Sequence, residues 1–147
     1  MIATVQPSTS TIMPPTYFDL KYVHPSQALS DIRDLTNNYT GIKDDGFVEN
    51  FNENMEWHFE TNTNVMFGYI PAPPESYPNR SDIIKKVIGE NGHWLKTTTE
   101  KAGIHFIWYD KARNNFMFWG PNYYTISRAM NAIRWRIIKY GNFKFDN

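Results

Sequence analysis

Residues 83–96 read IIKKVIGENGHWLK, with two glycines three positions apart. This stretch begins with apolar residues at helical spacing, which predicts a short helix that Ser81 caps and Gly89 stops. A second helix is predicted from about His93 to Lys101, with Gly103 as its stop signal. The stretch therefore predicts two short helices joined by a Gly-x-x-Gly turn.

Strands and a third helix are predicted around this pair. A β-branched and aromatic run predicts a strand at 65–70, and an extended Pro-rich connector follows it at 72–80. Two further strands are predicted at 104–109 and 116–119, on either side of a short polar turn. A last helix is predicted after Gly120-Pro121 because its apolar residues recur on one face: Ile126, Ala129, Met130, Ile133 and Ile137.

The N-terminal part is less regular. Residues 1–16 are rich in Ser, Thr and Pro and are expected to form a tail, although a partner or the domain could hold them in place. Short helices are predicted at 26–36, with Ser26 as the cap, and at 47–55. We therefore divide the chain into this tail, an acidic extension at 17–63 that packs on the domain, a domain at 64–140 and a C-terminal tail at 141–147.

The charge is balanced over the 147 residues but unevenly distributed. Residues 1–63 hold three basic and nine acidic side chains, whereas residues 64–147 hold twelve basic and six acidic ones. A basic domain suits a phosphate-bearing ligand, and an acidic extension could dock on it, oppose nucleic acid or meet another partner.

The order of elements from 64 to 140 resembles a KH (K-homology) domain. The residues that carry the resemblance are 83–96, then Lys101-Ala102-Gly103-Ile104-His105-Phe106, and finally Phe116-Met117-Phe118-Trp119-Gly120-Pro121. The resemblance covers about half of the chain, and the final strand and helix follow the Gly-x-x-Gly turn as in the type I order. It implies an α+β fold in which a three-stranded antiparallel sheet packs against three helices, here with an irregular or helical N-terminal extension.

In the KH family the Gly-x-x-Gly loop clamps the backbone of unpaired nucleotides while the bases lie in an adjoining groove. The resemblance assigns this clamp to four residues and places basic residues beside it and in the loop across the groove. The clamp residues are Gly89, Glu90, Asn91 and Gly92. The basic residues beside the clamp are Lys85, Lys86 and Lys96, and those in the loop across the groove are Lys111 and Arg113. Glu90 departs from the family pattern, since nucleic-acid-binding relatives usually carry a Lys or Arg within the loop and a carboxylate repels phosphate.

Other chemistries find little support in the sequence. The absence of Cys excludes disulfides and thiolate ligands, and the four His residues show no metal-ligand spacing. We expect no cofactor, no metal site and no enzymatic activity. No apolar run long enough to cross a bilayer occurs, so we expect a soluble intracellular protein of the cytoplasm or nucleus without membrane insertion.

Two functions from different classes remain open. The first is a non-enzymatic module that binds single-stranded nucleic acid, RNA rather than DNA. The second is a KH-like fold used as a structural or protein-interaction subunit of a larger assembly such as a virus particle, with contacts through the N-terminal tail and an aromatic-rich surface. Several aromatic residues could stack on bases, although most of them are expected in the core: Trp94, Phe106, Trp108, Phe116, Phe118, Trp119 and Trp135.

Overall fold

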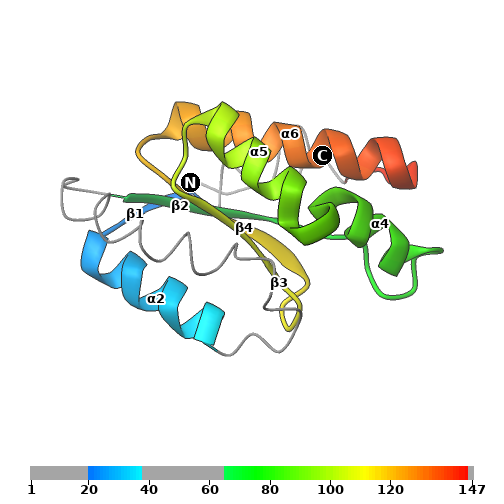
Figure 1. The fold of residues 1–147 in the computed structure, drawn as a ribbon, viewed down its shortest axis with the longest axis horizontal. Coiled ribbons are helices and arrows are strands. Elements are labelled where there is room, and N and C mark those ends of the chain that lie inside the picture. The colour runs from blue at the N-terminus through cyan, green and yellow to red at the C-terminus, as the bar shows by residue number, and fades with distance from the viewer. Residues whose placement is uncertain (1–19, 38–64, 146–147) are drawn as a thin grey trace, which may run out of the picture.

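The computed structural model describes residues 20–37 and 65–145. In this part of the chain a four-stranded antiparallel sheet, with strand order β1-β2-β4-β3, carries helices on both of its faces (Figure 1). The α+β class is as predicted, but the predicted number of three strands is wrong. The tail predicted at 1–16 and the short helix predicted at 47–55 lie outside the described residues.

The helices and strands follow the predicted order closely. The elements are β1 (Lys21–Val23), α2 (Pro25–Asn37), β2 (Val65–Pro71), α4 (Arg80–Ile88), the 3-10 turn η2 (Glu90–Gly92), α5 (His93–Ala102), β3 (Phe106–Asp110), β4 (Asn115–Gly120) and α6 (Tyr123–Gly141).

The predicted caps of two helices are wrong. Helix α4 begins one residue before Ser81, and its N-cap Asn79 lies in the left-handed region without a side-chain cap bond. Helix α2 begins at Pro25, and the amide of Ser26 donates to Nδ1 of His24 at 3.2 Å. A proline at the first helical position needs no hydrogen-bond acceptor for its nitrogen, so the histidine ring serves the next amide instead.

The fourth strand, β1, comes from the N-terminal extension. Lys21–Val23 pair antiparallel with the first residues of β2, in the register Lys21↔Phe67 to Val23↔Val65. Three residues are too few to show a polar–apolar alternation, so this strand is recognised only by its pairing with β2. The pairing covers the edge of β2 that would otherwise be open.

One face of the sheet packs against α4, α5 and α6. Strands β2, β3 and β4 contribute alternate residues to this face, as the two-residue period of a strand requires. They meet the apolar stripes of the three helices in a continuous core that includes Met66, Ile70, Ile107, Phe116, Phe118, Ile84, Val87, Leu95, Ile126, Met130, Ile133 and Ile137. Gly68 of β2 lets the side chains of Leu20 and Met130 pack directly on the strand backbone, because a Cβ there would lie 2.5 Å from side-chain atoms of both residues.

The other face of the sheet packs against α2 (Figure 1). Its strand residues are large and mostly aromatic, and they are buried together with Ala28 and Ile32 of α2. The rings of Phe106 and Trp119 lie 5.9 Å apart, and those of Phe106 and Trp108 lie 5.8 Å apart. This aromatic face is therefore part of a second core and not an open stacking surface.

Helix α2 should contribute to global stability, because Ile32 is completely buried against the aromatic face. We expect Ile32→Ala to lower the free energy of unfolding by about 2–5 kcal/mol, as large-to-small core changes do. Ser30→Ala, at an exposed position of the same helix, should change it by less than about 0.5 kcal/mol. Urea unfolding followed by tryptophan fluorescence measures both, and equal effects of the two variants would show that α2 does not pack as described.

Candidate nucleic-acid interface

The Gly-x-x-Gly loop reverses the chain between α4 and α5, and three of its four residues have a positive φ. Gly89 has φ 82° and ψ 164°, Asn91 has φ 54° and ψ 31°, and Gly92 has φ 73° and ψ 14°. The left-handed region is accessible to glycine and, among other residues, is best tolerated by asparagine. The Gly89 conformation is essentially restricted to glycine. The sequence Gly-Glu-Asn-Gly thus meets the backbone demands of the turn at each position.

Hydrogen bonds within the loop make it compact. The amide of Gly89 donates to the carbonyl of Lys85 at 2.8 Å, and the amide of Gly92 donates to the carbonyl of Gly89 at 3.1 Å. The amide of His93 donates to the carbonyl of Glu90. The amides of Glu90 and Asn91 take no part in these three bonds, and both of these residues are exposed.

Trp94 packs directly behind the loop. A Cβ on Gly89 would lie 2.5 Å from Cδ1 of the Trp94 indole and 2.9 Å from the Trp94 backbone nitrogen. The ring of His93 meets the indole edge to face, with centroids 4.8 Å apart. Gly89 is therefore required for two reasons, its backbone conformation and the space that the indole occupies.

Three predicted basic residues lie close to the loop along the chain. Lys85 and Lys86 occupy the last turn of α4 and are exposed, where their charge complements the negative end of the helix dipole. Lys96 lies one turn into α5 and is half-buried. Together with the four loop residues, these lysines account for seven of the nine predicted site residues, all at the junction of α4 and α5.

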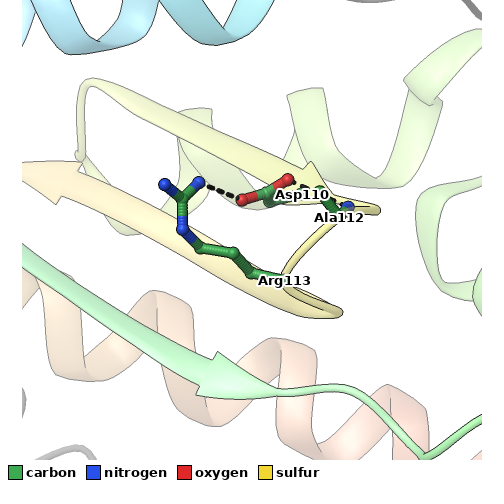
Figure 2. Close-up of polar contacts among 3 residues, drawn as sticks. All are labelled: Asp110, Ala112 and Arg113. Carbon is green, nitrogen blue, oxygen red and sulfur yellow. Dashed lines mark hydrogen bonds and ion pairs between the residues drawn. The ribbon is translucent and has the colours of Figure 1, made fainter.

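Lys111 and Arg113 lie elsewhere, in the turn between β3 and β4. Asp110, at the end of β3, accepts a hydrogen bond from the Ala112 amide at 3.2 Å and pairs with the Arg113 guanidinium at 2.6 Å (Figure 2). The Asp110 side chain is 8% exposed and that of Arg113 is 65% exposed. Arg113 thus neutralises a buried carboxylate, so its charge is already partly compensated, whereas Lys111 is exposed.

A polar network links this turn to the start of α4. The Arg80 guanidinium donates to the Tyr109 hydroxyl at 2.7 Å and to the Asn114 side-chain oxygen, and the Asn114 amide group donates to the Pro73 carbonyl at 2.9 Å. Burial raises the pKa of the Tyr109 phenol, and Arg80 opposes this effect. The network also fixes the Pro-rich connector against the β-hairpin.

The two groups of predicted residues therefore lie at opposite ends of α4. The hairpin turn is bonded to Arg80 at the first residue of the helix, and the loop follows Ile88 at its last residue. Nine helical residues at 1.5 Å each separate these ends by about 13 Å.

Sequence reasoning missed the role of Trp94 and of Arg136. Trp94 belongs to the aromatic residues of which most are expected in the core, yet it is 38% exposed and packs on the loop. Its position two residues after the second glycine indicates a residue close to the loop. Arg136 donates to the Lys86 carbonyl across 50 residues of sequence, and such a contact leaves no local pattern.

Most of the aromatic candidates for base stacking are buried, as expected. Trp135 of α6 is the exception besides Trp94, with 63% of its surface exposed. Within the described ranges 20–37 and 65–145, no cluster of three or more His, Asp or Glu side chains could hold a metal ion. None of the helices described there combines the length and apolar character needed to cross a membrane.

Comparisons with known proteins identify no relative. No family model matches the chain, and neither curated proteins nor solved structures gave a significant match. The function has therefore to be inferred from the residues and the geometry of the loop.

The contact between Gly89 and Trp94 predicts a large difference between two glycine substitutions. Gly103 also has a positive φ, 77°, but its Cβ would meet nothing closer than 3.9 Å. We expect Gly103→Ala to cost about 1–2 kcal/mol, the penalty of the left-handed region, and Gly89→Ala to cost at least about 1 kcal/mol more. Chemical denaturation measures both, and equal losses would contradict the close packing of the indole on the loop.

Proposed function

We propose that the chain is a non-enzymatic, KH-like module that binds single-stranded nucleic acid, with RNA as the preferred ligand. The loop Gly89–Gly92 would lie against the sugar–phosphate backbone of the strand. The observation that carries the proposal is the tight, glycine-dependent turn between two helices, which leaves Glu90 and Asn91 exposed. The two glycines of the loop carry no side chain, which lets a ligand backbone approach closely.

The arrangement of the elements supports this proposal. Strands β2, β4 and β3 lie side by side in that order, and α4, α5 and α6 cover one face of them. The resemblance to a KH domain implies such a three-stranded antiparallel sheet packed against three helices. Strand β1 extends the sheet at the edge of β2, and helix α2 packs on the face opposite α4, α5 and α6.

The local charge also supports a phosphate ligand despite Glu90. Lys85 and Lys86 are exposed immediately before the loop, so two positive charges accompany one negative charge there. Each lysine that neutralises a phosphate releases a counterion, which makes the affinity fall as salt rises. Glu90 should weaken the affinity by repulsion without removing the site.

Charge-changing variants test the proposal. Lys85→Ala with Lys86→Ala should weaken the binding of fluorescein-labelled single-stranded RNA and lower the salt slope by up to about 1.4, since each phosphate contact on a single strand contributes about 0.7. Glu90→Lys should strengthen the binding. Fluorescence anisotropy over a salt series measures these changes, with random-sequence RNA and DNA oligonucleotides in parallel.

The matched control is Lys101→Ala with Lys144→Ala, which removes two exposed lysines that belong neither to the loop nor to the turns adjoining it. Lys101 lies in the last turn of α5, at the opposite end of that helix. The proposal is wrong if the wild-type protein binds neither oligonucleotide at low salt. It is also wrong if the two double variants lose affinity equally.

The outer face of α6 favours a second candidate function, a protein-interaction subunit. Tyr124 is 70% exposed, Trp135 is 63% exposed and Ile138 is 37% exposed. Their spacing of 11 and 3 residues places them along one side of the helix. Large exposed rings in such a line are typical of surfaces that bind another protein.

Site-specific photocrosslinking tests this second function. We expect a photoreactive amino acid at position 135 to form discrete crosslinks to a protein in the source cells. The same group at position 27, an exposed residue of α2, should form none. Identical crosslinking patterns at the two positions, or no crosslink at position 135, would rule out the α6 surface as a specific protein interface.

A further inference from the structure

Helix α6 supplies two arginines that make parallel contacts with the ends of other helices. Nη2 of Arg136 donates to the Lys86 carbonyl, in the last turn of α4, at 2.7 Å. Nη2 of Arg128 donates to the Ala102 carbonyl, at the last residue of α5, at 2.9 Å. Carbonyls at a helix C-terminus lack partners within the helix, and a cation there also complements the helix dipole.

Each guanidinium also lies over aromatic rings, but the rings differ in position. Arg136 lies 4.3 Å from the centre of the Trp94 ring and 5.0 Å from that of Tyr140. Arg128 lies 5.1 Å from the centre of the Tyr124 ring, which belongs to α6 itself. Of the two arginines, Arg136 therefore joins three elements: the end of α4, the start of α5 and the C-terminal half of α6.

We infer that Arg136 is a positioning residue for the Gly-x-x-Gly loop. It fixes the Lys86 carbonyl on one side of the loop and the Trp94 indole on the other, and the indole packs on Gly89. The last turn of α4 and the first turn of α5 are thus held at one angle before any ligand arrives. A preorganised loop avoids the entropy cost of ordering on binding.

The chemistry of this contact requires arginine and not lysine. A guanidinium is planar, so it can stack on the indole while one of its N–H groups donates to a carbonyl. An ammonium group keeps the charge and one hydrogen bond but does not stack in this way. Arg136→Lys should therefore restore only part of what Arg136→Ala loses.

Amide hydrogen exchange of the full chain tests the inference without a ligand. We expect Arg136→Ala to speed the exchange of the Gly89, Gly92 and His93 amides about tenfold, because these amides make the hydrogen bonds within the loop. Arg128→Ala removes the same charge and a similar helix-end contact, so it should leave these three amides unchanged. Arg136→Lys should give an intermediate rate.

The effect on nucleic-acid binding rests on the proposed function and is measured separately. We expect Arg136→Ala to weaken the binding of labelled single-stranded RNA about tenfold more than Arg128→Ala does. A wild-type protein that does not bind RNA would refute the proposed function, while selective loop exchange in Arg136→Ala would still support the positioning role.

Equal exchange rates at the three loop amides in the two alanine variants would overturn the inference. If Arg136→Ala does not fold, Arg136→Lys and Arg128→Ala make the same comparison. In that pair, faster loop exchange in Arg136→Lys supports the positioning role and unchanged exchange refutes it.

Discussion

The reversal of the chain between α4 and α5 is the constraint on which the candidate site depends. Four residues turn the chain from one helix into the next, and Gly89 does so in a conformation and a space that exclude a side chain. The space is filled by Trp94, which Arg136 covers from α6. The shape of the loop is therefore set by packing behind it, while the side chains of Glu90 and Asn91 remain exposed.

The two covered faces of the sheet limit where a ligand can bind. Alternate residues of β2, β3 and β4 are buried either against α4, α5 and α6 or against α2. The aromatic rings on the α2 side are buried and cannot stack on bases, even though the many aromatic residues in the sequence suggest that they could. Contact with a strand of nucleic acid would then depend on backbone and charge near the loop more than on stacking over the sheet.

Much of the fold could be predicted because its signals are local. Helical periodicity located α2, α4, α5 and α6, and runs of β-branched and aromatic residues located β2, β3 and β4. Strand β1 could not be predicted, since three residues carry no periodicity and their pairing with Val65–Phe67 is distant in sequence. The strand count was wrong for this reason.

The same distinction between local and distant signals applies to the candidate site. The loop residues follow from a contiguous motif, but the contact of Arg136 with the Lys86 carbonyl spans 50 residues of sequence and appears only in three dimensions. Composition did indicate a basic domain. It could not show that Arg113 is partly neutralised or that Arg136 is committed to holding a helix end.

An NMR titration of the isotope-labelled protein with a short single-stranded RNA shows where a ligand contacts the chain, because it reports the backbone amides together. We expect the largest shift changes at Glu90 and Asn91 and in the adjoining turns of α4 and α5, and we expect them to diminish as salt is raised. Shift changes confined to other surfaces, such as the outer face of α6, or no changes at low salt, would contradict the proposed function.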